Sequence, residues 1–268
     1  MTRSLISGYC TGEMTQRQEP SALGRIVELV RDLRNRCSWD RAQTRATLRP
    51  YLVEEVLELD HALAMDDVDA IKDEVGDVLL HMAFQIVLGE ETGEFGAEDV
   101  TNAIVTKMKR RHPHLFDLGD EPETWEKQKL QESDSESPSI LDGLPPSLPA
   151  LLMAYRLQER AAGVGFDWPD TKGPRAKVAE ELAELDHEMQ EGRDAGRVES
   201  EIGDLLFSII NLARKIGCDP RAALEKANQK FDRRFRQVER LAVERNIDVG
   251  RASLEELDVL WEEAKQSG

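Results

Sequence analysis

The stretch Leu52-Val-Glu-Glu-Val-Leu-Glu-Leu-Asp-His61 occurs a second time as Val178-Ala-Glu-Glu-Leu-Ala-Glu-Leu-Asp-His187. Aligning Glu55 with Glu181 places the two copies 126 residues apart. In both copies apolar residues recur at three- and four-residue spacing, which is typical of one face of an α-helix. Such internal similarity indicates a duplicated structural unit. The sequence therefore predicts two tandem copies of a helical unit.

Two further motifs follow each copy in the same order. Glu74-Val-Gly-Asp77 matches Glu201-Ile-Gly-Asp204, 127 residues later. Lys107-Met-Lys-Arg-Arg111 resembles Lys230-Phe-Asp-Arg-Arg234. Each half thus contains E-x-x-E, then E-x-x-D, then K-x-x-R-R.

The composition favours an all-α fold and excludes several classes of partner. Among 268 residues, 53 are acidic and 35 basic, which gives a net charge of −18, and aromatic residues make up only 5%. Because an acidic surface repels phosphate backbones, we expect no nucleic acid polymer as a partner. No stretch approaches the roughly 18 apolar residues of a membrane helix, and the first twenty residues lack a signal-peptide core. We expect no membrane association.

The cysteines point to a reducing compartment. Cys10, Cys37 and Cys218 are an odd number without a C-x-x-C pair, so they form neither a disulfide framework nor a zinc site. The chain is therefore expected in the cytoplasm.

Apolar periodicity and breaker residues predict the helices and the domains. In the first half, the predicted helices run from near Leu23 to a break at Cys37–Asp40, from Tyr51 after Pro50 to about Met65, from Val68 to Glu91, and from Ala97 to Arg111. The second helical region is predicted to start at Leu151–Gln158. The predicted organisation is a mobile leader (1–20), an N-terminal four-helix domain (21–118), an acidic linker (119–144) and a C-terminal four-helix domain (145–268).

The repeated carboxylates have the spacing of metal ligands. Residues three apart share a helix face, so Glu181 lies beside Glu184, and Glu201 beside Asp204. If the two helices pack antiparallel, four carboxylates converge into an all-oxygen site, which suits Mg²⁺ or Mn²⁺ and has room for a second ion. The first copy offers a secondary N-terminal metal site with the matching residues Glu55, Glu58, Glu74 and Asp77.

A plainer interpretation is that E-x-x-E simply faces water, as most charged runs do. The apolar run Leu205–Ile210 argues against it for E-x-x-D, because it predicts a central helix with Glu201 and Asp204 near the core. Burying unpaired carboxylates costs several kcal/mol, so they should be paired or metal-bound. An arginine would satisfy one of them, but the doubled four-carboxylate pattern favours a metal.

The basic motif places three cations on one helix face. Lys230, Arg233 and Arg234 are spaced i, i+3 and i+4, and by themselves they indicate a solvated stripe paired with glutamates. Beside a metal cluster they would form a phosphate clamp, because arginine holds phosphate oxygens bidentately. The segment Gly163-Val-Gly165 lacks the Gly-Lys of a Walker loop, which disfavours a P-loop NTPase.

The ordered motifs in a repeated helical unit resemble the MazG-type nucleoside triphosphate pyrophosphohydrolases, of the all-α NTP pyrophosphatase superfamily. The likeness covers nearly the whole chain after about Leu23. Further stretches that carry it are Cys37-Ser-Trp-Asp40, Arg110-Arg-His-Pro-His114-Leu-Phe116, Leu148-Pro-Ala-Leu151, Val164-Gly-Phe-Asp-Trp168 and Asn211-Leu-Ala-Arg214. The resemblance implies Mg²⁺-dependent hydrolysis of standard or aberrant NTPs and dNTPs to the monophosphate and pyrophosphate by a homodimer, a house-cleaning enzyme.

The resemblance also implies site residues. The catalytic and metal-binding residues it implies are Glu181, Glu184, Glu201 and Asp204. The nucleotide-binding residues it implies are Lys177, Glu180, Glu181, Arg197, Ser200, Asp204, Lys230, Arg233, Arg234 and Trp261. Trp261 offers a face for a base, and a C-terminal core anchor is an equally good interpretation. The motifs leave open which glutamate acts as the base.

The two halves are not equivalent. Tyr51 stands where the second copy has Lys177, so the first copy lacks one cation although its carboxylates are intact. In two-domain relatives the C-terminal copy is regarded as the main catalytic one. We therefore expect the principal site in the C-terminal copy and a weaker, regulatory or structural site in the N-terminal one. A rival hypothesis is a non-catalytic helical scaffold that binds nucleotide or a partner protein.

Overall fold

A computed structural model of the chain describes residues 21, 23–116, 139–190 and 195–266. Within these ranges every regular element is a helix and no strand occurs, which confirms the predicted all-α class. Contacts divide the chain into two units, Met1–Lys109 and Arg110–Gly268, and each is described by itself. The predicted leader 1–20 lies outside the described residues, as does most of the predicted linker 119–144.

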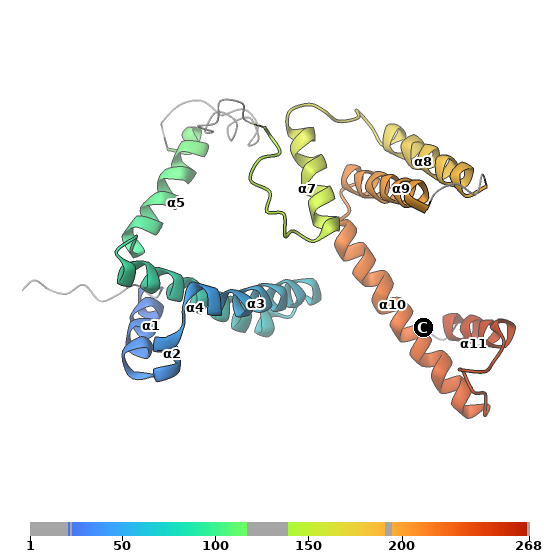
Figure 1. Cartoon of the computed structure of the whole chain (residues 1–268), viewed down its shortest axis with the longest axis horizontal. Helices are drawn as coiled ribbons and strands as arrows, with labels where there is room; N and C mark the ends of the chain where they lie inside the picture. The colour runs from blue at the N-terminus through green and yellow to red at the C-terminus, as the bar shows by residue number, and fades with distance from the viewer. Residues whose placement is uncertain (1–20, 22, 117–138, 191–194, 267–268) are drawn as a thin grey trace, which may run out of the picture. The chain divides into compact units, whose positions relative to one another are not determined.

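The first unit is built from helices α1 to α5 (Figure 1). Their bounds are Gly24–Arg36 for α1, Ser38–Ala42 for α2, Arg45–Met65 for α3, Val68–Thr92 for α4 and Ala97–Arg111 for α5. The short 3-10 helix η1 follows at Pro113–Leu115, past the boundary between the two units. The predicted positions of α1, α4 and α5 are confirmed, whereas the break expected at Cys37–Asp40 contains the one-turn helix α2.

The start of α3 differs from the prediction, which placed it at Tyr51. The helix begins six residues earlier because the side chain of Thr44 accepts a hydrogen bond from the Thr47 amide (3.2 Å), and the Thr47 hydroxyl accepts one from the Thr44 amide (2.8 Å). This reciprocal cap fixes the first turn. Pro50 then lies inside the helix, where its missing amide hydrogen removes one backbone bond without ending the helix.

The carboxylate-bearing helices of the first unit form a hairpin. The turn between α3 and α4 is fixed by Asp66 in the left-handed conformation (φ 54°) and by Asp67, whose side chain caps the Ala70 amide at 3.2 Å. Helix α4 also packs on α1. Away from the turn of the hairpin, a core cluster holds these helices together, formed by Val30, Leu48, Ala83, Phe84, Val87 and Leu88.

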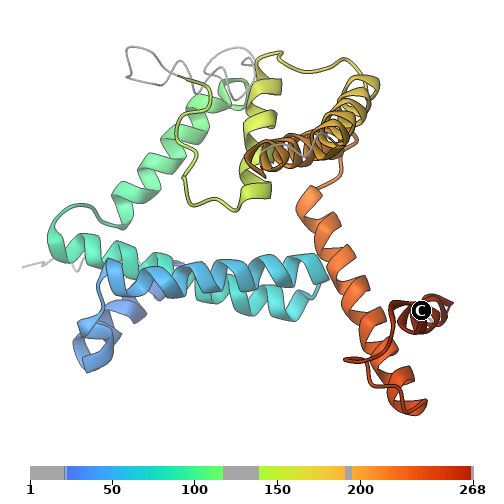
Figure 2. The same cartoon turned by 45° about the vertical axis from the view of Figure 1, so that its right-hand side comes forward.

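The second unit repeats the hairpin. Its helices are α7 (Ala150–Gly163), α8 (Lys172–Gln190), α9 (Ala195–Lys215), α10 (Pro220–Glu244) and α11 (Leu254–Gln266). Helices α8 and α9 lie side by side, α7 packs on α9, and α11 packs on α10 (Figures 1 and 2). The core cluster of this unit lies between α10 and α11 and is formed by Val238, Leu241, Ala242, Leu260 and Ala264.

Helix α9 is not the enclosed central helix that its apolar run predicted. Ile202, Leu206 and Ile209 expose 45%, 52% and 45% of their surface, while Ser208 and Ile210 are buried. The reason is that α7 and α8 cover only part of its circumference. Along the described part of the chain, no helix combines the length and the apolar character that a membrane span requires.

Candidate metal and nucleotide site

The C-terminal hairpin brings three of the predicted metal ligands together. Glu181 comes from α8, and Glu201 and Asp204 come from successive turns of α9; one oxygen of each lies within 4.8 Å of the others. Oxygens on one Mg²⁺, at about 2.0–2.1 Å from the ion, are at most about 4.2 Å apart, so the spacing of the set is close to that of oxygens sharing an ion. The all-oxygen donor set suits a hard divalent cation.

The burial of these ligands differs from the sequence-based expectation. Asp204 is exposed and Glu201 half-buried, whereas Glu181 retains only 4% of its surface. The prediction that Glu201 and Asp204 lie near the core is therefore wrong for Asp204, because its carboxylate lies beside Glu181 of α8 at an edge of the helix pair that stays open to solvent. The desolvated carboxylate of the cluster belongs to α8.

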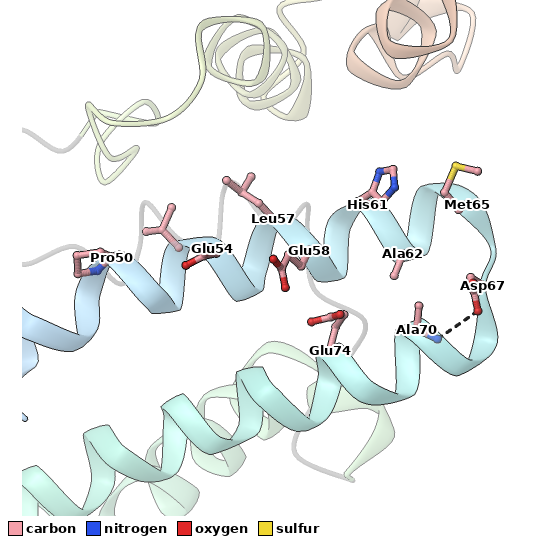
Figure 3. Close-up of a pocket in the computed structure, with 11 residues that line it drawn as sticks. Pro50, Glu54, Leu57, Glu58, His61, Ala62, Met65, Asp67, Ala70 and Glu74 are labelled. Atoms are coloured by element: carbon pink, nitrogen blue, oxygen red, sulfur yellow. Dashed lines mark hydrogen bonds between the residues drawn. The ribbon is translucent and has the colours of Figure 1, made fainter. Parts of the chain in front are cut away.

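The N-terminal hairpin forms the corresponding cluster from Glu55 and Glu58 of α3 and Glu74 of α4, again within 4.8 Å. Figure 3 shows Glu58 and Glu74 pointing toward each other across the hairpin. Asp77 is outside this trio, as Glu184 is outside the C-terminal one. Both remain close enough to act electrostatically, since Asp77 raises the pKa of Glu55 and Glu74, and Glu184 that of Glu201.

Crowding of like charges is a shared property of the two clusters. The pKa of Glu201 is raised, first by burial and then by the negative charges of Glu184, Asp204, Glu181 and Glu188. Burial likewise raises the pKa values of Glu55 and Glu74, with neighbouring carboxylates adding to it. A bound cation would relieve this repulsion, so the residues present fit a divalent metal ion.

Lys177 makes the two clusters different. Its Nζ contacts the Oε1 of Glu181 and lies 2.9 Å from the Oε1 of Glu180. These two acceptors, first the Glu181 hydrogen bond, raise the pKa of Lys177, so the ammonium is charged. In the N-terminal copy Tyr51 occupies the aligned position, and the Oε1 of Glu55 faces the Nε2 of His81 at 4.0 Å instead.

Glu188 is a residue that sequence analysis missed. It is half-buried on α8, and its Oε1 lies 3.9 Å from an Nη of Arg197, while its Oε2 is buried without a hydrogen-bond partner among the described residues. The signal was present, since Glu188 follows Glu184 by four residues on the same face of α8. The aligned residue of the first copy is the buried Ala62. Arg197 thereby lies beside the cluster, and the adjacent Ser200 is exposed.

The predicted phosphate clamp and Trp261 lie together on the α10–α11 pair. The Trp261 ring packs on Phe231, with ring centroids 5.4 Å apart, and Phe231 follows Lys230 directly. Lys230 and Arg233 are exposed. The Nε of Arg234 is buried and, within the described ranges, has no acceptor. In the same ranges no ion pair joins these cations to the carboxylate cluster.

An open groove of about 670 Å³ follows the N-terminal hairpin beside its cluster. Glu58 and Glu74 form part of its wall, and Leu57, His61 and Met65 also line it, with Met65 next to the turn (Figure 3). The lining has no lysine or arginine. The groove therefore offers apolar surface next to a carboxylate cluster but little that would bind phosphate directly.

The loop before α8 is anchored by an ion pair that sequence analysis did not assign. Asp167 accepts hydrogen bonds from Arg214 (2.7 Å) and Lys215 (3.0 Å) at the end of α9. These bonds, chiefly that from Arg214, lower the pKa of Asp167 to about 2. The signal lay in the quoted stretches 164–168 and 211–214, which contain Asp167 and Arg214, while Lys215 follows directly. The anchor fixes the start of the helix that carries Lys177 and Glu181.

Fold and site together define a class: an all-α protein with a duplicated helical hairpin, each copy of which brings three carboxylates close together. Comparison with known proteins identifies the family. Residues 43–116 and 172–239 match the MazG nucleotide pyrophosphohydrolase domain, so both hairpins lie in matched segments. The chain belongs to the MazG family.

The relatives agree with this assignment. The chain is 43% identical over 246 residues to the nucleoside triphosphate pyrophosphohydrolase/pyrophosphatase MazG of Thermotoga maritima. The aligned region covers 90% of this chain and 94% of the relative. It is 41% identical over 250 residues to the nucleoside triphosphate pyrophosphohydrolase of Escherichia coli K12, with 90% and 95% covered. The family predicted from the motifs is confirmed, and with it the enzyme class, a nucleoside triphosphate pyrophosphohydrolase.

Proposed function

We propose that the chain hydrolyses nucleoside triphosphates, standard or aberrant, to the monophosphate and pyrophosphate, with Mg²⁺ as cofactor and Mn²⁺ as a substitute. The principal site is the C-terminal copy, with Glu181, Glu184, Glu201 and Asp204 as the catalytic and metal-binding residues. The observation that carries this proposal is the meeting of Glu181, Glu201 and Asp204 on a hairpin within the matched family segment.

The chemistry follows from charge. A divalent cation, when bound, neutralises the triphosphate and polarises the phosphorus that water attacks. The carboxylates would hold that cation, and a carboxylate or the metal would activate the attacking water. Lys177 contributes a charged ammonium at the edge of the cluster.

The remaining nucleotide contacts in this proposal are Glu180, Arg197, Ser200, Lys230, Arg233, Arg234 and Trp261. The contact between Trp261 and Phe231 supports it, because an aromatic surface beside Lys230 suits a base next to its phosphates. The unpaired Nε of Arg234 supports it as well, since an acceptor from a ligand would satisfy a buried donor.

We further propose that the enzyme works as a homodimer in the cytoplasm. Ile202, Leu206 and Ile209 leave an apolar stripe on α9, and a second copy would bury such a stripe. The free thiols of Cys37 and Cys218 support a reducing compartment, while Cys10 lies outside the described residues. The N-terminal cluster would serve as a secondary metal site with a regulatory or structural role.

The rival function is a scaffold that binds nucleotide without turnover. Purified protein with Mg²⁺ and a panel of NTPs and dNTPs distinguishes the two, with monophosphate and pyrophosphate measured separately. The enzyme should release both in equal amounts, and a chelator should stop the reaction. Nucleotide binding without either product would favour the scaffold.

A further inference from the structure

Lys177 contacts one carboxylate oxygen of Glu181, which is a member of the trio that a metal ion at the C-terminal cluster would share. Its Nζ contacts the Oε1 of Glu181, whose side chain is only 5% exposed, whereas the lysine side chain itself is 39% exposed. A buried carboxylate needs a counter-charge, and here the counter-charge comes from the same helix, four residues away. An ammonium group and a divalent cation therefore compete for Glu181.

The lysine also has a second acceptor. The Oε1 of Glu180, on a side chain that is 56% exposed, lies 2.9 Å from Nζ. If Lys177 leaves Glu181, it keeps the ion pair with Glu180 and stays at the edge of the cluster. Its long, half-exposed side chain has the freedom to reach a ligand from there.

The N-terminal cluster provides a natural comparison within the same chain. Tyr51 takes the place of Lys177, and in the described part of the structure Glu55 has no lysine or arginine partner. Its half-buried carboxylate is instead left with a raised pKa by burial and by Asp77 and Glu58. The first copy has the ligands without the internal cation.

We propose that Lys177 is an internal counter-ion of the metal-free C-terminal site, which leaves Glu181 when a divalent cation binds and is thereby released to bind the phosphates of the nucleotide. This proposal rests on the proposed function. It makes metal binding and nucleotide binding favour each other, and by linkage the effect is reciprocal. It also makes the C-terminal cluster the weaker metal site when nucleotide is absent.

The test separates metal affinity from nucleotide affinity in the full-length protein. A background with Glu55→Gln and Glu74→Gln removes the N-terminal cluster, and calorimetry then measures the binding of Mn²⁺ alone. A second titration, at saturating Mn²⁺, measures the binding of an α,β-methylene nucleoside triphosphate. Its base is that of the nucleotide which the protein hydrolyses fastest. Both titrations are run for the background protein, for Lys177→Met and Lys177→Arg, and for the control Lys265→Met. The control removes a lysine from another i,i+3 ion pair, with Glu262.

Opposite changes are the expected signature. Lys177→Met should bind Mn²⁺ alone about three- to tenfold more tightly, because the competing charge is gone. The same variant should bind the nucleotide analogue at least about tenfold more weakly. Lys177→Arg should restore both affinities toward the parent values, and Lys265→Met should change neither. If Lys177→Met leaves Mn²⁺ affinity unchanged or lowers it, Lys177 is a phosphate contact or a structural residue only, and the proposal is wrong.

The reciprocal variant keeps the proposal testable if Lys177→Met does not fold. In a background with Glu201→Gln and Asp204→Asn, Tyr51→Lys should weaken Mn²⁺ binding at the N-terminal cluster about three- to tenfold. Unchanged or stronger binding would contradict the proposal. Failure of the proposed function looks different: the unmodified protein would then release no pyrophosphate, whatever the lysine variants do to Mn²⁺ affinity.

Discussion

The two hairpins show how a duplication keeps ligands and changes their surroundings. Both align E-x-x-E on one helix with E-x-x-D on the next, yet the trio in the first unit is Glu55, Glu58 and Glu74, and that in the second is Glu181, Glu201 and Asp204. Identical E-x-x-E and E-x-x-D motifs therefore do not determine which carboxylate oxygens come together in a cluster. Small changes in how two helices face each other decide it.

The neighbouring positions diverge further than the ligands. Tyr51 corresponds to Lys177, Ala62 to Glu188, and His81 to Ser208, when the two copies are aligned on their motifs. The second copy thus gains a cation and a carboxylate, and the first gains a buried imidazole whose pKa burial lowers. We infer that any division of labour between the copies resides in these neighbours.

The largest expected effect on turnover comes from substituting the proposed metal ligands of the two copies. Glu201→Gln or Asp204→Asn should lower pyrophosphate release by more than about a hundredfold, since even outer-shell partners of metal ligands are worth about 10–100-fold. The matched changes Glu74→Gln and Asp77→Asn should have a clearly smaller effect. Steady-state turnover with saturating Mg²⁺ measures both. The reverse pattern would assign catalysis to the N-terminal copy.

The second prediction concerns the anchor of the C-terminal hairpin. The folded pKa of Asp167 is about 2, below its ordinary value of 3.8, so its stabilisation is present above about pH 4 and is lost as the pH falls toward 2. Asp167→Asn should lower the free energy of unfolding by about 2 kcal/mol at pH 7, measured by urea denaturation.

The difference between Asp167→Asn and the unmodified protein should shrink toward zero near pH 2. The first unit supplies the control, because Arg34 there pairs with Glu91, whose side chain is 45% exposed. Glu91→Gln should cost less stability than Asp167→Asn. An Asp167→Asn effect that does not depend on pH would show that the ion pair is not its cause.

The third prediction concerns the repulsion within the metal-free clusters. The folded pKa of Glu74 is raised, so its charge opposes folding above that pKa and the cost disappears as the pH falls through it. In the presence of a chelator, Glu74→Gln should therefore raise the thermal midpoint at pH 7, and the gain should shrink at pH 5. Glu201→Gln should give a smaller gain, because Lys177 already offsets part of the charge. Scanning calorimetry at the two pH values measures both gains. An equal gain for the two variants would contradict the idea that Lys177 offsets charge in the C-terminal cluster only.

The smallest effect concerns the glycines inside the E-x-x-D motifs. A Cβ added at Gly76 or Gly203 would meet nothing within 4 Å, so the chain's own packing requires neither glycine. Replacement by alanine should stabilise each hairpin by about 0.5–1 kcal/mol. Gly217→Ala is the control of opposite sign, because its φ of 72° disfavours a side chain. If Gly203→Ala also lowers turnover while Gly76→Ala does not, a ligand or second copy approaches the C-terminal motif closely.

Much of the local structure follows from the sequence, and its exceptions have identifiable causes. Helices α4 and α5 lie where apolar spacing and the flanking Asp67, Gly93 and Gly96 place them. Helix α3 begins earlier than Pro50 suggested, because the cap between Thr44 and Thr47 outweighs a single lost backbone bond. A hydrogen-bonded cap of this kind is harder to recognise in a sequence than a proline, so Pro50 was the stronger indicator of the helix start.

The sequence alone determined the helical class, the duplication and the pairs of carboxylates, because a helix of fixed pitch puts residues three apart on one face wherever it lies. The tertiary structure decided that Glu181 is the buried carboxylate of its cluster, that Asp204 is exposed, and that Phe231 contacts Trp261. Such properties depend on which face one helix turns toward another, and helical periodicity does not specify that rotation. The sequence sets the positions of the charged residues. The desolvation of the Glu181 carboxylate, and hence its need for a counter-ion, arises only from helix packing.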